Sequence, residues 1–381
     1  MGTITEVGDR IRAVMPLGMS QRQLAERAGM TPDALSRALN GQRGLSPVEV
    51  AKIAQTLGAD THWLIAGAPD PFAITIAARH AWDAGRRERH NPGKQDDQPL
   101  LDRVIGLYRA AFPQGPTASA ELPDLPASMR ELLGPEFVRN FADNVEQRLN
   151  VDVIRIPGLG TDYSLRVGQR GVIVLATQAN WFRSNWSLAH ELGHLALDHH
   201  SAYESPRRTQ RDERAADAFA AELLISQRDL DEVGTAGTEA SLARTIWKLG
   251  ISTEALRNRL TSARVQANSA VMEALRTPTP RLLRANVHAF DDSGEGINQV
   301  TAREQAASAR RFPLTLLSAL QTQTEHGAAS PAHLSWALDV PVDDIEFPEP
   351  DKKTADYERM LADRPSADHW LSMITGAAQT Q

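Results

Sequence analysis

The sequence NWSLAHELGHLALDHH occupies residues 185–200 and combines helical periodicity with side chains that bind metals. His190 and His194 are four residues apart, so on a helix both project from one face and can bind one cation. Glu191 is offset around the helix, where it can act on a water beside the metal without binding the metal itself. The apolar residues that would bury this helix are Trp186, Leu188, Leu192 and Leu195. The stretch therefore predicts a buried helix with a catalytic zinc site.

A catalytic zinc needs a third protein ligand, and two downstream residues are candidates. His200 lies six residues past His194, but Leu197 stands where a glycine is needed to turn the chain back, so we set His200 aside. Glu213 lies nineteen residues past His194, in RDERAADAFAAELLIS, which predicts a second helix. Asp217 follows one turn later and can accept the free N–H of a histidine ligand. We therefore expect Glu213 as the third ligand, in an arrangement that resembles the thermolysin-like gluzincins.

The motifs of this region together resemble one family. NWSLAHELGHLALDHH, DERAADAFAAELLIS and GISTEALRNRL look like those of the ImmA/IrrE metallopeptidases, over about residues 100–262. The resemblance implies a small zincin-like domain in which strands at 151–156 and 171–176, separated by a glycine-containing turn region, flank the active helix. Ser226 departs from the family, which often has proline there, and this affects helix termination rather than chemistry.

The resemblance also implies how the residues would act. His190, His194 and Glu213 would hold Zn²⁺, although such ligand sets also accept Mn²⁺. Glu191 would be the general base in the hydrolysis of a peptide bond. Family members typically act on a repressor, so we expect a repressor-type protein substrate and a role in a stress response. Three side chains are candidates for stabilising the oxyanion, and the sequence does not rank them: Tyr163, His199 and Tyr203.

The amino-terminal segment predicts a second functional unit. Ser20 and Gln23 form a capping-box pattern, Gly29 suits a tight turn, and Thr31 would cap the next helix. Two short helices joined by a glycine turn, the second with a polar exposed face, follow the helix-turn-helix plan. SQRQLAERAGMTPDALSRALNGQR closely resembles the helix-turn-helix of phage-repressor-like regulators of the Xre or Cro/C1 type, which implies a five-helix bundle.

This second resemblance implies double-stranded DNA as a partner. The residues that we expect to face bases or phosphates are Gln21, Thr31, Asp33, Ser36, Arg37, Asn40 and Arg43. Residues 1–67 hold seven basic and six acidic side chains, a difference of +1. Because phosphate contacts supply much of the affinity for DNA, this weak charge suggests that binding needs a homodimer.

Composition limits the other possibilities. The chain has 381 residues, a formal net charge of −7 and no cysteine, which excludes disulfides and thiolate metal sites. No segment reaches the roughly 18 apolar residues of a membrane span. The amino terminus also lacks a signal-peptide pattern, so we expect a cytoplasmic protein without membrane contact.

We expect a mostly α-helical chain with a small α+β part. Its segments are a helix-turn-helix domain at 1–67, a partly helical linker at 68–98, a metallopeptidase domain at 99–262 and a mainly helical region of unknown role at 263–381. Within the last segment, residues 310–350 have helix, turn, helix spacing but lack exposed basic residues after Arg311. This favours packing or partner recognition over contact with DNA.

Three functional hypotheses follow from the two resemblances. The leading one is a DNA-tethered zinc endopeptidase, a hydrolase that cleaves a repressor. The second is a transcriptional regulator whose zincin domain senses a ligand or partner without cleavage, because a free-standing protease would not need a helix-turn-helix. The third is an antitoxin or immunity protein that acts by binding alone. The sequence does not identify the substrate, the operator or the activating signal.

Overall fold

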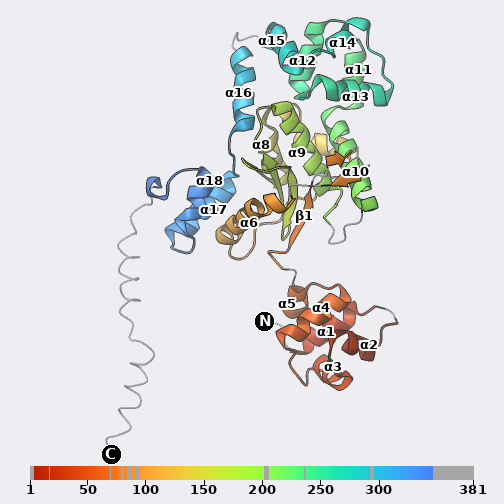
Figure 1. The fold of residues 1–381 in the computed structure, drawn as a ribbon, viewed down its shortest axis with the longest axis vertical. Helices are drawn as coiled ribbons and strands as arrows, with labels where there is room; N and C mark the ends of the chain where they lie inside the picture. Colours follow the sequence, from red (N-terminus) through yellow and green to blue (C-terminus); the bar gives the residue numbers. More distant parts are fainter. Residues whose placement is uncertain are drawn as a thin grey trace, which may run out of the picture.

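The structure is a computed structural model, and it describes residues 4–16, 18–68, 70–78, 81–83, 88–90, 94–200, 206–235, 237–291 and 296–345. Figure 1 shows an amino-terminal helical bundle, a central sheet with helices on its faces, and further helices toward the carboxyl terminus. The chain is mostly helical around one four-stranded sheet, so the predicted fold class is confirmed. No helix among these residues is long and apolar enough to cross a membrane.

The amino-terminal bundle contains the predicted helix-turn-helix. Ser20 and Gln23 form a capping box, and Gly29 ends the same helix with a φ of +68°. Thr31 caps the following helix with its hydroxyl group. The helices of the bundle are α1 (Ile4–Val14), α2 (Gln21–Ala28), α3 (Pro32–Leu39), α4 (Pro47–Leu57) and α5 (Thr61–Ala66). They share one core of fully buried side chains, which include Leu24, Leu35, Ile53 and Leu64.

The crossing of α1 and α3 depends on a glycine, and this gives a prediction about stability. A Cβ atom at Gly8 would lie 2.3 Å from the backbone carbonyl oxygen of Leu39. We expect Gly8→Ala to destabilise the bundle by about 1–3 kcal/mol, because the two helix backbones must move apart. The measurement is hydrogen exchange of the α3 amides in the full chain. In the control, Gly106→Ala, the new Cβ meets no atom within 4 Å, so α3 should keep its protection. Equal protection in both variants would contradict the prediction.

The central sheet has the strand order β1-β5-β6-β4. The parallel strands β4 (Asp152–Ile156) and β6 (Arg170–Ala176) correspond to the two predicted strands. Along the sequence, β5 (Tyr163–Val167) lies between these two strands, and in the sheet it pairs antiparallel with β6. We expected only a turn region there. β1 (Ile74–Ala78) pairs antiparallel with β5 and lies in the segment expected to be a partly helical linker. That expectation was wrong at this point, because the β-branched residues of ITIAA find a sheet edge to pair with.

The remaining elements connect and cover this sheet. After β1 the described chain continues through the paired strands β2 (Ala81–Asp83) and β3 (Glu88–His90). The other helices are α6 (Lys94–Ala111), α7 (Pro126–Leu133), α8 (Phe141–Leu149), α9 (Trp181–Ala196), α10 (Pro206–Leu224), α11 (Gln227–Thr235), α12 (Glu239–Leu249), α13 (Thr253–Ala263), α14 (Ser269–Ala274), α15 (Thr279–Ala285), α16 (Gly296–Ser308), α17 (Leu314–Glu325) and α18 (Pro331–Leu338). Short 3₁₀ turns are η1 (Phe137–Asn140), η2 (Val287–Ala289) and η3 (Val342–Asp344).

Helices cover both faces of the sheet (Figure 1). On β6, Ile173 and Leu175 join a core with α8, α9 and α10, whereas Val172 and Val174 join a core with α6, α17 and α18. This alternation follows from the two-residue period of a strand. The helices of the 310–350 segment thus pack on the sheet, which agrees with the packing interpretation of that segment.

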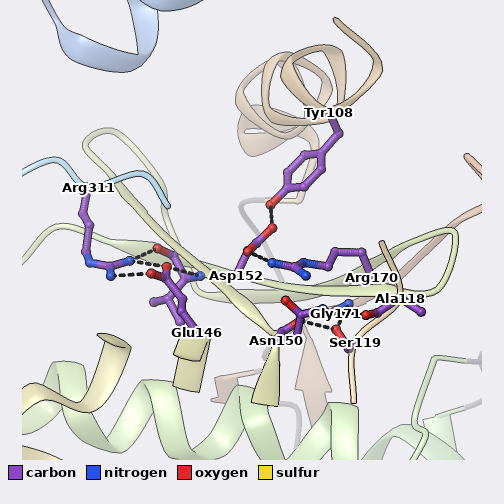
Figure 2. Close-up of polar contacts among 10 residues, drawn as sticks. Tyr108, Ala118, Ser119, Glu146, Asn150, Asp152, Arg170, Gly171 and Arg311 are labelled. Carbon is purple, nitrogen blue, oxygen red and sulfur yellow. Dashed lines mark hydrogen bonds and ion pairs between the residues drawn. The ribbon is translucent and has the colours of Figure 1, made fainter. Parts of the chain in front are cut away.

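Buried polar contacts hold the parallel strands in place (Figure 2). Asp152 of β4 accepts a hydrogen bond of 2.6 Å from the hydroxyl of Tyr108 on α6. The same carboxylate forms a buried ion pair with Arg170 of β6. On the other side, Arg311 donates to the carboxylate of Glu146 on α8 at 2.8 Å. These contacts connect the sheet to α6, and they connect α8 to the segment that precedes α17.

Candidate metal centre

The two histidines of the HELGH segment lie on the buried side of α9. His190 is fully buried and His194 is 3% exposed. Their Nε2 atoms are 3.1 Å apart. The helix begins after Asn180, whose side chain accepts the backbone N–H of Arg183. Because positions i and i+4 share one face of a helix, local structure alone brings the two ring nitrogens together.

Glu213 of α10 completes the group. Its Oε2 lies 3.4 Å from Nε2 of His190, and its Oε1 lies 3.8 Å from Nε2 of His194. The carboxyl group is buried with the histidines. The two helices approach closely at Gly193, where a Cβ atom would lie 3.1 Å from the ring of Phe219. The missing side chain at this position allows α10 to bring Glu213 to the histidines.

Glu191 lies beside this group and is fully buried. Within the part of the chain that the structure describes, neither of its carboxylate oxygens has a hydrogen-bond partner. Burial raises the pKa of Glu191 to about 8; His190 opposes this rise, and Asp162 and Glu213 add to it. Buried polar atoms normally have partners, so these two oxygens indicate a ligand or water of the site. A carboxyl group at this position, beside three ligand side chains, is placed to exchange a proton with a molecule bound there.

Each histidine of the group has a second contact at its Nδ1 atom. Asp217 places Oδ1 3.0 Å from Nδ1 of His190. His199 places its own Nδ1 3.0 Å from Nδ1 of His194. Such contacts hold a ring in one orientation and fix its tautomer, which leaves Nε2 free for a metal.

The two rings differ in their electrostatic surroundings. Burial lowers the pKa of His190, but hydrogen bonds to Asp217 and Glu213 raise it to about 9. Burial and the neighbouring His190 hold the pKa of His194 well below its usual value. Protons on both facing Nε2 atoms would repel each other, whereas one shared cation would satisfy both rings and the carboxylate.

The geometry of the group fits a divalent metal ion. The ligand atoms of His190, His194 and Glu213 all lie within 4.8 Å of one another. Two imidazoles and one carboxylate form a ligand set typical of catalytic zinc sites, which keep one position open. The buried carboxyl of Glu191, with no partner among the described residues, lies next to them.

The three oxyanion candidates lie in different places. Tyr163 belongs to β5, but its side chain joins the opposite core, where its hydroxyl donates to Asp97 at 2.7 Å. The structure therefore does not bring Tyr163 to the metal group, because alternate residues of a strand face opposite sides. His199 lies against His194 at the edge of the group. Tyr203 falls outside the described residues.

Ser164 of β5 and Asp162 also lie near the metal group, and sequence reasoning did not find either of them. Ser164 faces Glu191 and lowers the pKa of that carboxyl, whereas Asp162, just before the strand, raises it. Burial and the charge of Arg166 lower the pKa of His200 to about 4. His200 is buried but lies outside the three-residue metal group. The alternation of YSLRV is the signal that could have revealed this strand.

The residues expected to contact DNA lie on α2, on α3 and in the turn after α3. Gln21, Asp33 and Arg37 are exposed, and Ser36 is half-buried. Thr31 is exposed as well, but its hydroxyl accepts the backbone N–H of Ala34 as a helix cap.

The remaining two expected DNA contacts have partners within the protein. The side-chain oxygen of Asn40 accepts a hydrogen bond from Arg12. Arg43 donates to the carboxylate of Glu49 at 2.7 Å. A phosphate would have to compete with these partners.

Comparison with known proteins supports both units of the chain. Residues 146–261 match a family model described as the IrrE N-terminal-like domain, and residues 10–64 match one described as helix-turn-helix. The chain is 24% identical over 257 residues to the radiation response metalloprotease IrrE of Deinococcus radiodurans. The similarity covers 56% of this chain and 74% of that protein. No solved structure shows a significant match. The two family resemblances seen in the sequence are thereby confirmed.

Proposed function

We propose that this chain is a DNA-binding regulatory protease, because residues 146–261 match the IrrE N-terminal-like domain and residues 10–64 match a helix-turn-helix domain. It would hydrolyse a peptide bond in a partner protein. The observation that best supports this proposal is the buried metal-ligand group with the carboxyl of Glu191 beside it.

The proposed chemistry assigns one role to each residue. His190, His194 and Glu213 would hold Zn²⁺, with Mn²⁺ as an alternative for the same ligands. When bound, the metal would supply Lewis-acid polarisation of the scissile carbonyl and activation of water. Glu191 would take a proton from the attacking water and return it to the leaving amine. Asp217 would hold His190 in the tautomer that binds metal, and His199 and Tyr203 stay candidates for stabilising the oxyanion.

We propose a repressor-type transcription factor as the substrate. The relative in Deinococcus radiodurans is named a radiation response metalloprotease, so a stress response is the setting that we propose for this chain. The helix-turn-helix would bring the protease to double-stranded DNA, with exposed contacts from Gln21, Asp33 and Arg37. A homodimer would double the phosphate contacts of a bundle that carries little net charge.

The alternative function is a transcriptional regulator that senses a ligand or partner through the metallopeptidase domain without cleavage. The helix-turn-helix domain favours this alternative, because a protease that acts by itself would not need one. In such a regulator, the response to the ligand or partner would be a change in DNA binding. An antitoxin or immunity protein would belong to the same class of binding proteins. These alternatives predict regulation that does not need Glu191.

The decisive test compares cells that express wild type, Glu191→Gln or Glu222→Gln. Glu222 lies on α10 but is exposed, so its substitution is a matched control. We expect wild type and the control to shorten one transcriptional repressor, whereas Glu191→Gln leaves that repressor intact because it lacks the proton-transfer group. Mass spectrometry of new protein amino termini provides the measurement. Equal shortening with Glu191→Gln would contradict the assigned role, and no shortening with any variant would favour the sensing regulator.

A further inference from the structure

The strand β1 occupies the edge of the sheet beside the metal group. It pairs antiparallel with β5 from Ile74 opposite Val167 to Ala78 opposite Tyr163. In this register Ala77 lies opposite Ser164, the residue that faces Glu191. The end of β1 therefore runs past the catalytic side of the metal group.

The face of β5 toward α9 is polar, unlike its other face. Ser164 and Arg166 are on this face, and Arg166 donates a hydrogen bond of 3.1 Å to the carbonyl oxygen of Leu195 in α9. On the opposite face, Leu165 and Val167 are fully buried in the second core. β1 therefore pairs with the edge of the strand whose Ser164 faces Glu191, beside the metal group.

β1 lies outside the region that matches the family model, although it pairs into the same sheet. The matched region, residues 146–261, contains β4, β5 and β6 but not β1. β1 comes from the segment just after the helix-turn-helix. Its core-facing residues Ile74 and Ile76 are only half-buried. Because less apolar area is removed from water on β1 than on β5, β1 is the strand that leaves the sheet at the lower energetic cost.

We propose that the edge of β5 is the docking site of an extended peptide substrate and that β1 is the chain's own occupant of this site. An unpaired sheet edge offers a row of backbone donors and acceptors, and extended peptides bind such edges as an added strand. The peptide that fits is an extended, unstructured segment of the partner protein, read through its backbone. This inference rests on the proposed function. It adds that β1 blocks the binding of the substrate peptide until β1 leaves the edge of β5.

A short connector transmits movement of the helical bundle to β1. Asp60, which caps α5, accepts the backbone N–H of Asp70 at 3.2 Å. At the other end, Gly168 donates its N–H to the carbonyl of Ala73 at 2.9 Å. The connector is therefore bonded both to the bundle and to the sheet. A shift of the bundle on DNA or on a partner would pull at β1 directly, which is how DNA binding would reach the metal group.

The absence of cysteine makes a locking experiment clean. The bond from Gly168 to Ala73 marks a hydrogen-bonded pair, so Ile74 and Val167 form the next, non-hydrogen-bonded pair, whose side chains are closest. Ile74→Cys/Val167→Cys should form a disulfide that locks β1 onto β5. Thr75 lies in the following hydrogen-bonded pair, so Thr75→Pro removes a backbone donor and should release β1.

Peptide binding, rather than cleavage, is the first readout. The variants are made in the Glu191→Gln background, loaded with Zn²⁺ and titrated against a fluorescein-labelled library of octapeptides by fluorescence anisotropy. We expect the oxidised, locked chain to bind at least tenfold more weakly than the reduced chain, and Thr75→Pro to bind at least threefold more tightly. The single-cysteine variants Ile74→Cys and Val167→Cys, treated with the same oxidant, should not change. Hydrogen exchange of the β4 and β6 amides, which do not pair with β1, checks that both folds are intact.

The outcomes separate this inference from the proposed function. Equal binding by the locked and reduced chains, or no binding even by Thr75→Pro, would overturn the inference. Hydrolysis of the library by chains with Glu191 intact is measured in parallel. If binding follows the lock but no peptide is hydrolysed, the docking edge stands and the protease proposal fails. If hydrolysis occurs equally with and without the lock, the protease stands and the role of β1 is refuted.

Discussion

The Glu213→Gln variant is expected to lose tight metal binding and, with it, peptide hydrolysis. Glu213 is 1% exposed and supplies the only carboxylate of the three-residue ligand group that the described residues form. A neutral amide cannot balance the charge of a divalent cation, and its oxygen is a poorer ligand than a carboxylate. We expect metal affinity to fall on the order of 10³-fold, more than the 10–100-fold cost of removing an outer contact. Competition with a chromophoric chelator and metal analysis after dialysis measure this change.

Two further variants on α10 serve as controls for the metal affinity of Glu213→Gln. Asp217→Asn keeps the ligands but weakens the contact with His190, so its affinity should fall by about 10–100-fold. Glu222→Gln is exposed and should bind metal like wild type. An unchanged affinity in Glu213→Gln would show that the third ligand lies elsewhere, and His200 would then be the first residue to examine.

The Asp152→Asn variant is expected to lower the free energy of unfolding of the metallopeptidase domain by about 3–5 kcal/mol. Asp152 is 2% exposed and neutralises Arg170, which is 6% exposed. Asparagine keeps the shape and can still accept the hydrogen bond of Tyr108 (Figure 2), but it leaves the guanidinium charge buried without a partner. Because a domain is stable by about 5–15 kcal/mol, this loss should lower the melting temperature markedly.

An exposed ion pair provides the control for this second prediction. Arg228 and Glu232 of α11 are 3.2 Å apart, with side chains 88% and 51% exposed. Pairs of this kind contribute little, so Arg228→Gln should change stability by less than about 0.5 kcal/mol. Urea unfolding of both variants under the same conditions gives the comparison. Similar losses of unfolding free energy in the two variants would contradict the prediction, because the buried pair would then contribute no more to stability than the exposed pair.

The sequence predicted those features that depend on local geometry. The spacing of His190 and His194 determines their relation on any helix, and the capping pattern at Ser20 determines where α2 begins. Only the family resemblance and the helical context of Glu213 predicted its role as a ligand. Local spacing does not predict it, because the distance from Glu213 to the histidines depends on how α10 packs at Gly193.

The sheet edge beside the metal group was much harder to predict. β5 is short, and its face toward α9 carries Ser164 and Arg166, so no continuous apolar run marks it as a strand. β1 forms only because β5 leaves an edge open, which is a tertiary effect that no local pattern contains. Tyr163 was an oxyanion candidate because it is near the motif, and only the register of β5 shows that it faces the other core.

Both cores of the sheet are completed late in protein synthesis, because one includes Ala307 and the other includes Ala337. The face with Ile154, Val172 and Val174 is covered in part by α6, and its cover is complete only with α18, which ends roughly 160 residues after β6. At ribosomal speed this interval lasts about 8–30 s. The amino-terminal bundle can fold within that time, because all of its core lies before residue 65. A newly made chain would therefore be able to reach DNA before its hydrolytic half has finished folding, and the apolar sheet face would depend on chaperones until then.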